Sequence, residues 1–219
     1  MKRQDSMKDY KKINLPLLTK QDEEYNMLID VAEEISRQKA EKTSEKKSGD
    51  ATEIVVRKYL HNHGFNVSPS CVYVNPCDRE IDLLILKEGV LSNQKCYSPK
   101  QVHVVLEIKN NAVGGTEKNG VVITPSMDIR QRFNDVEKAT KLNRFGVVVL
   151  SERLLSRTPY KYAITEEEIG IKNCRVFTCV LRRVWARLRE KAVIVEMQES
   201  GQLWKSSEWQ DFINYLKGN

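Results

Sequence analysis

Two apolar runs in the middle of the chain restrict the choice of fold more than any other feature. Segments 80–87 and 102–110 contain consecutive apolar residues at their centres, at 83–86 and 104–106. A strand with one face in solvent alternates apolar and polar residues, whereas a continuous apolar run is typical of a strand covered on both faces. We therefore expect an α/β fold in which helices flank both faces of a central sheet.

The other expected elements fit around these two runs in a single order. A helix ended by Gly64 comes first, and Pro, Asn, Gly and Ser residues separate the strands that follow it. The expected elements are a helix at 50–63, strands at 65–74, 80–87 and 102–110, a glycine-rich loop at 112–120, a helix at 127–142 and a strand at 145–150. The sequence thus predicts an α-β-β-β-α-β unit.

Further elements are expected on both sides of this unit. They are an extended lead at 13–18, a polar helix at 21–46 with a linker-like polar tail at 36–49, β-like runs at 175–181 and 192–197, and a helix at 208–217. We predict a single compact domain overall. Its parts are a helical N-terminal arm at 1–47, a core at 48–155 and a C-terminal extension at 156–219 that packs on the core.

Basic residues exceed acidic ones, and the excess is uneven along the chain. The 219 residues contain 36 Lys and Arg against 30 Asp and Glu, a formal charge of +6. Segment 128–219 holds 17 basic and 12 acidic residues, so most of the surplus lies there. Such an excess favours a polyanion partner, although a modest net charge also simply keeps a protein soluble.

One short stretch of this segment is densely basic. Its arginines are Arg182, Arg183, Arg187 and Arg189, and Trp185 stands among them. The arginines are predicted to bind a nucleic-acid backbone, with Trp185 stacked on a base. Trp185 is equally consistent with a side chain of the core.

The cysteines and the chain's apolar content bear on its compartment. The five cysteines do not form the paired short spacings of a structural zinc site, and only three histidines accompany them. We expect reduced, mostly buried thiols.

No stretch approaches the ~20 apolar residues of a membrane span, and no apolar run follows the charges of the N-terminus. We therefore expect an intracellular, cytoplasmic protein without a membrane partner.

Charged residues occupy strand positions where apolar residues would be expected. In an extended chain Asp82 shares one face with Leu84 and Leu86, and Glu107 shares a face with Lys109 at the end of the other run. A carboxylate on an apolar face is unfavourable unless it binds something. If the two strands are adjacent and antiparallel, the beginning of one meets the end of the other, and the three charged side chains converge.

Taken singly, each of these residues has an ordinary explanation. Glu107 and Lys109 fit a solvated ion pair at a strand end, and Asp82 fits a strand terminus. Glu80 is a reserve acid for the same site, and it also fits an exposed charge at the entry to a strand. The combination, in this order, is what makes a catalytic site the stronger interpretation.

Asp82 followed by Glu107-Ile108-Lys109 resembles the motif of the PD-(D/E)xK nuclease superfamily, over about residues 48–151. The core of that superfamily is αβββαβ, the order predicted above. The resemblance therefore implies an α/β, restriction-endonuclease-like fold with a mixed central sheet flanked by helices. Ile81 stands where the motif has its proline, at a position that varies in the superfamily.

The resemblance also implies roles for individual residues. Asp82 and Glu107 would ligate Mg²⁺, with Mn²⁺ as a substitute, and the backbone carbonyl of Ile108 would be a further ligand. Lys109 would lie beside the attacking water. Glu53 corresponds to the helical acid of the superfamily, which completes the catalytic set and is a further candidate metal ligand. These roles suit phosphodiester hydrolysis, because a cation held by a few carboxylates supplies both nucleophile and charge stabilisation.

Two interpretations of Glu53 are open. With Asp50 it fits a capping box, in which its side chain bonds to a backbone N–H. It also shares a helix side with Val56 and Leu60, which would turn it inward to the site. The charges of the later helix, at 128–144, fit either a solvated face or a face that approaches the substrate.

Together these observations predict a metal-dependent nuclease that hydrolyses phosphodiester bonds by attack of an activated water. The expected substrate is double-stranded DNA, cut by a restriction-type endonuclease that acts as a homodimer. A Holliday junction resolvase is the alternative within this class. The alternative outside it is a catalytically silent module of the same fold that binds nucleic acid or a protein partner.

Overall fold

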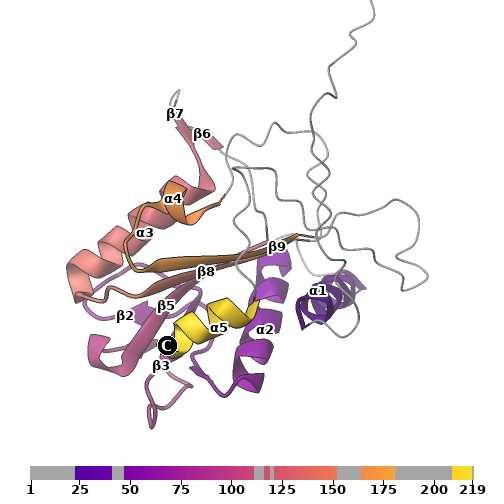
Figure 1. Ribbon diagram of the computed structural model, residues 1–219, viewed down its shortest axis with the longest axis horizontal. Helices are drawn as coiled ribbons and strands as arrows, with labels where there is room; N and C mark the ends of the chain where they lie inside the picture. Colours follow the sequence, from indigo (N-terminus) through magenta and orange to yellow (C-terminus); the bar gives the residue numbers. More distant parts are fainter. Residues whose placement is uncertain are drawn as a thin grey trace, which may run out of the picture.

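A five-stranded mixed sheet forms the centre of the molecule (Figure 1). The computed structural model describes residues 23–40, 47–110, 116–118, 121–151, 164–180 and 209–218. The strands, in spatial order, are β1 (Asn66–Val67), β3 (Leu83–Leu86), β5 (Val102–Lys109), β8 (Phe145–Ser151) and β9 (Cys174–Val180). β3 pairs antiparallel with both β1 and β5, whereas β8 runs parallel to both β5 and β9.

Helices cover both faces of this sheet, as the continuous apolar runs predict (Figure 1). On one face lie α1 (Glu23–Ala40), α2 (Lys47–Asn62) and α5 (Trp209–Lys217), and on the other lie α3 (Pro125–Thr140) and α4 (Glu166–Ile169). Leu83 and Ile85 of β3 belong to the apolar cluster of the first face, and Leu84 and Leu86 belong to that of the second. The α/β class and a mixed sheet flanked by helices are therefore confirmed, and this architecture is compatible with a restriction-endonuclease-like fold.

Local sequence explains where α3 begins and ends. Thr124 is the N-cap, and its side-chain oxygen accepts a hydrogen bond from the backbone N–H of Met127 at 3.2 Å. Pro125 follows at the first helical position, where its missing N–H is no loss. Lys141 ends the helix with a left-handed φ of 64°. The buried side of α3 carries Ile129, Phe133 and Val136, which pack on the sheet.

Three segments that are distant in sequence meet where α5 begins. The backbone N–H of Trp209 donates to Glu24 of α1 at 3.1 Å, and the Trp209 indole N–H donates to His63 at 3.2 Å. The hydroxyl of Tyr215, near the other end of α5, lies 2.6 Å from the carbonyl oxygen of Asn173. Polar contacts thus fix α5 at both ends, in addition to its buried apolar side. The division into arm, core and extension stays a prediction.

Several element boundaries differ from those predicted. The predicted strand 65–74 is divided into β1 and β2 (Tyr73–Val74), and between them Cys71 takes a positive φ of 57°. Because that backbone conformation interrupts an extended strand, β2 leaves the main sheet and pairs with β4 (Cys96–Tyr97). The first helix is described over Glu23–Ala40, and the rest of its predicted range to 46 lies outside the described residues. α2 is already helical at Lys47, before its predicted start at 50.

An additional element begins within the predicted glycine-rich loop and continues beyond it. β6 (Thr116–Lys118) and β7 (Val121–Ile123) form an antiparallel hairpin that projects from the body of the molecule (Figure 1). The short helix α4 is also additional. The predicted lead at 13–18 and strand at 192–197 lie outside the described residues.

The structure also describes the state of the cysteines and the character of the helices. The five cysteines are free thiols, and Cys77, Cys174 and Cys179 are buried. Among the described helices none combines the length and the apolar character that a membrane crossing requires.

Candidate active site

The register between β3 and β5 brings the predicted acids together. The two strands are antiparallel with Leu83 opposite Leu106, so the residue before Leu83 faces the residue after Leu106. These residues are Asp82 and Glu107. The Asp82 Oδ2 atom accepts a hydrogen bond from the backbone N–H of Ile108 at 2.6 Å, which fixes the carboxylate against the neighbouring strand. The predicted convergence of strand beginning and strand end is therefore present.

The acids lie on the α3 side of the sheet. Side chains alternate between the two faces of a strand, and Leu84 and Val105 belong to the apolar cluster on the α3 side. Asp82 has the alternation of Leu84, and Glu107 has that of Val105. Lys109 follows on the same face as Glu107. An apolar layer thus lies directly beside three charged side chains.

Glu107 is the most deeply placed of the charged groups, with 2% of its surface exposed. Its Oε1 atom accepts hydrogen bonds from the ammonium of Lys109 and, at 3.1 Å, from the guanidinium of Arg132 on α3. The Arg132 Nε atom lies 3.2 Å from Asp128 Oδ2, one helical turn earlier. Two cations therefore neutralise one buried carboxylate oxygen.

Burial dominates the electrostatics of the two acids. Burial raises the pKa of Asp82, and the positive charges of Lys109 and Arg132 oppose this effect without cancelling it. Burial also raises the pKa of Glu107, and the negative charge of Asp82 raises it further, against the same two cations. Two like charges are thus held close together in a poorly solvated place, which is typical of functional sites.

Glu53 is placed differently from the other predicted residues. α2 begins at Lys47, so Asp50 lies within the helix, and the capping-box interpretation of Asp50 and Glu53 is wrong. Glu53 is buried, with 9% exposed, as the inward interpretation requires. However, α2 packs on the sheet face opposite to the one that carries Asp82 and Glu107.

Cys71 connects Glu53 with the two strands. Burial raises the pKa of the Cys71 thiol to about 11, and the charges of Glu53, Glu80 and Asp82 add to this effect. All three acids therefore lie near enough to Cys71 to affect the pKa of its thiol. Still, the described part of the chain contains no group of three His, Cys, Asp or Glu side chains placed to hold one metal ion. As the side chains stand, the site is a pair of carboxylates.

Other predicted residues lie around the site or outside the described chain. Glu80 is exposed, and its Oε2 atom accepts a hydrogen bond from the Tyr73 hydroxyl at 3.3 Å. Ile108 directs its N–H to β3, and in a strand the N–H and C=O of one residue point to the same side. Arg182, Arg183, Arg187 and Arg189 lie outside the described residues.

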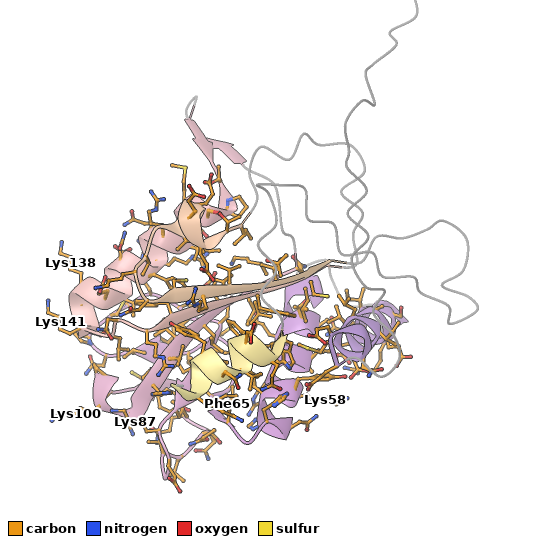
Figure 2. The ribbon with its side chains drawn as sticks, in the orientation of Figure 1. Lys58, Phe65, Lys87, Lys100, Lys138 and Lys141 are labelled. Carbon is orange, nitrogen blue, oxygen red and sulfur yellow. The ribbon has the colours of Figure 1, made fainter. Side chains whose placement is uncertain are left out.

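The charges of the later helix divide into separate groups. Arg132 enters the site, whereas Arg130 donates to the backbone oxygen of Ile169 at 2.7 Å and so holds α4. Lys138 and Lys141 lie on the outer rim of the molecule with Lys87 and Lys100 (Figure 2). This lysine rim, defined as Lys87, Lys100, Lys138 and Lys141, is at the strand ends opposite to the acids, because Lys87 follows β3 and Lys100 precedes β5.

Arg132 and Asp128 are not among the residues that the motif predicts. A sequence signal for them exists, since Asp and Arg four residues apart pair on a helix. Arg132 also directly precedes Phe133, a member of the buried stripe, so it lies at the edge of the buried side. That signal predicts an ion pair on α3 near the sheet, but it does not predict which strand the ion pair contacts.

Comparison with known proteins adds little to this geometry. No family model matches the chain, and no curated protein matches it. A solved structure to which it is similar is that of NucC from P. aeruginosa ATCC27853 in its cAAA-bound form, at 13% identity, covering 72% of this chain and 74% of that chain, with a TM-score of 0.44. A similarity at this level supports no conclusion about function, so a functional proposal must be argued from the residues of this chain.

Proposed function

We propose that this protein is a metal-dependent nuclease that hydrolyses phosphodiester bonds, with DNA as its substrate and internal bonds as its targets. One observation carries the proposal: Asp82 and Glu107 are adjacent on neighbouring strands, and Lys109 contacts Glu107. This is the arrangement that the acid-acid-lysine motif requires. Glu107 is buried and Asp82 is half-buried, unlike the partners of a surface ion pair.

The chemistry of the donors fits a divalent cation. Mg²⁺ is commonly held by one or two carboxylates and keeps several waters, which suits a site with two acids. Asp82 and Glu107 would hold the ion, and the Ile108 carbonyl is a further candidate ligand on the same side. Glu53 would join them only after a change in side-chain position. Mg²⁺ or Mn²⁺ bound there would lower the pKa of water and offset charge on the phosphoryl oxygens.

The chain's own residues supply the remaining functions. The Lys109 ammonium contacts Glu107 and is partly exposed, so it can orient the attacking water and offset negative charge as it develops on phosphorus oxygens. Water attacks phosphorus and loses a proton to solvent, the bond to the leaving oxygen breaks, and that oxygen takes up a proton from solvent. Because a duplex has two strands, cutting both calls for two copies of the site, and we expect a homodimer on DNA.

Plasmid cleavage in Mg²⁺ or Mn²⁺ tests this proposal. We expect Asp82→Asn and Lys109→Met each to slow cleavage by at least about 100-fold, because each removes a group that acts on the reacting atoms. The matched controls are Glu88→Gln and Lys87→Met, the same chemical changes beyond the other end of β3. They should cleave as the wild type does. Cleavage that survives both site substitutions would sink the assignment.

The same assay separates the alternatives. Faster cleavage of a four-way junction than of linear duplex would indicate a resolvase. Salt-sensitive binding of nucleic acid without cleavage of any DNA or RNA would indicate a silent binding module.

A further inference from the structure

Arg132 reaches the site from an element that carries no part of the motif. Its NH1 atom lies 3.1 Å from Glu107 Oε1, the oxygen that also accepts from Lys109. Its Nε atom is held 3.2 Å from Asp128, in the first turn of α3. The Arg132 side chain is 36% exposed, against 24% for Lys109. Of the two cations on Glu107, Arg132 is the more open to solvent.

Asp128 pairs with Arg132, so three acids and two cations meet at the site. When all are ionised, Asp82, Glu107 and Asp128 carry three negative charges, and Lys109 and Arg132 carry two positive ones. A divalent cation at the acids would change this net charge from −1 to +1. It would also compete for the Glu107 oxygen on which both cations converge. One of them must then turn to another anion.

Arg132 is better placed than Lys109 to turn away. Lys109 is two residues from Glu107 on the same strand face, so its ammonium stays beside that carboxylate. Arg132 is attached to a different element, and Asp128 anchors its Nε atom, which leaves the outer edge of the guanidinium to pivot. That edge presents two parallel N–H groups, the fork that matches two oxygens of a phosphate.

We propose that Arg132 is the substrate-phosphate ligand of this site, paired with Glu107 in the metal-free protein and transferred to a phosphodiester when Glu107 takes a divalent cation. The inference rests on the proposed function and names the residue that couples metal binding to substrate binding. Asp128 is the positioning residue that holds the guanidinium.

If the ion pair of Arg132 and Glu107 had a purely structural role, the expected changes in metal and DNA affinity would be different. Removing such an arginine leaves Glu107 half-neutralised and loosens the site, so affinities for metal and for DNA would fall together. A phosphate ligand that competes with metal gives changes of opposite sign. Without Arg132, metal binds Glu107 more tightly, while DNA loses a charge-assisted hydrogen bond.

The test compares Arg132→Met and Arg132→Lys with the wild type at about pH 8, well above the ordinary pKa of a carboxyl group. Mn²⁺ affinity is measured on the substrate-free protein by titration calorimetry. Duplex DNA affinity is measured by fluorescence anisotropy with Ca²⁺, which takes the same oxygen donors. The matched control is Arg175→Met, since Arg175 is 54% exposed and pairs with Glu166 at 3.0 Å, away from the acids.

For Arg132→Met we expect Mn²⁺ affinity to rise about tenfold, because a nearby positive charge is removed. DNA affinity with Ca²⁺ should fall about tenfold or more, as for a lost hydrogen bond to a charged group. Arg132→Lys should hold Mn²⁺ within about threefold of the wild type and still lose DNA affinity, because an ammonium lacks the fork. Arg175→Met should change neither affinity.

A parallel fall of both affinities in Arg132→Met, or unchanged DNA affinity, overturns the role of Arg132. Asp82→Asn distinguishes this failure from failure of the proposed function. If wild type and Asp82→Asn bind Mn²⁺ equally, the acids are not a metal site, and the proposed function fails with them. If only Arg132→Met behaves against expectation, the nuclease proposal stands and the phosphate ligand lies elsewhere.

Discussion

Burial raises the pKa of Asp82, and the charges of Lys109 and Arg132 offset only part of this effect. The pKa of Glu107 is raised for the same reason and by Asp82 itself. Folding therefore favours the protonated form of each carboxyl. When both carboxyls are ionised, the folded protein keeps two charges in a place that resists them, which destabilises it relative to a neutral pair. Such a local loss of stability is common at functional sites.

The pH dependence of stability follows from these directions. A raised folded-state pKa gives stability that is fully present below the unfolded-state pKa and is lost as the pH rises through the folded-state pKa. We expect Asp82→Asn to melt above the wild type at about pH 8, since Asn keeps an acceptor oxygen for Ile108 and carries no charge. Each kcal/mol corresponds to about 2–4 °C for a chain of this length.

The advantage of Asp82→Asn should shrink as the pH is lowered to about 4, where the wild-type carboxyl is protonated as well. Thermal unfolding by circular dichroism at several pH values measures it, with Glu88→Gln as the control in an exposed turn. A lower melting temperature for Asp82→Asn at the alkaline end would mean that the ionised carboxylate stabilises the fold, contrary to the raised pKa.

Residue by residue, part of the site could be predicted from the sequence. Asp82, Glu107 and Lys109 were predictable because strand alternation places each charge on a known face, and charges on apolar faces are conspicuous. Arg132 was not, because its contact with Glu107 depends on how α3 docks on the sheet. Glu53 was predicted to point inward correctly, but its helix covers the other face of the sheet.

At the scale of elements, long apolar segments were predicted more accurately than short ones. β5, β8 and α3 lie within two residues of their predicted bounds, since many buried positions define each of them. The run 65–74 was predicted as a single strand, because its apolar residues continue through the segment. The left-handed backbone at Cys71 breaks it, and no apolar pattern encodes that turn.

Gly146 shows how closely β8 is packed beneath α5. A Cβ atom at this position would lie 2.7 Å from Leu106 Cδ2 and 3.1 Å from Phe212 Cζ. We expect Gly146→Ala to lower the free energy of unfolding by about 1–3 kcal/mol, as overpacking does in dense cores. Urea unfolding measures this change.

A second variant checks the cause. Leu106→Val removes the atom that the new methyl group would meet. Gly146→Ala should therefore be less destabilising in a Leu106→Val background than in the wild type, giving a non-zero coupling in a double-mutant cycle. Purely additive effects would show that the close approach is not what makes glycine necessary.

On the scale of the whole molecule, charge is distributed unevenly. The proposed metal-binding acids lie in the described core, where Lys109 and Arg132 already pair with Glu107. The densest arginine stretch, Arg182 to Arg189, lies outside the described residues, and the lysine rim lies at the strand ends opposite to the acids. The excess of basic residues is visible in the sequence, but the surface that a polyanion would contact cannot be predicted from it.

Salt dependence of DNA binding tests which basic group holds the substrate. We expect replacement of Arg182, Arg183, Arg187 and Arg189 by Gln to reduce the slope of log affinity against log salt by about 2–4, since each phosphate contact contributes about 0.9. Fluorescence anisotropy between about 50 and about 200 mM salt measures the slope. The matched control replaces the four residues of the lysine rim by Gln.

The control should leave the slope as it is in the wild type, because the lysine rim lies at the strand ends opposite to Asp82. An equal reduction in both quadruple variants would indicate diffuse attraction to net charge. A reduction in the lysine variant alone would assign substrate binding to the opposite end of the molecule.

The pairing of Leu83 with Leu106 has an evolutionary consequence. Both side chains pack in apolar layers, and a slip of one residue would move each strand's whole apolar set to the wrong face. The leucines therefore hold the register that places the acids opposite each other, to which the acids add the hydrogen bond between Asp82 and the Ile108 N–H. A descendant could exchange both acids, keep this scaffold and even gain stability. Catalytic activity can therefore be lost without loss of the fold, and the result would be a protein that only binds its partner.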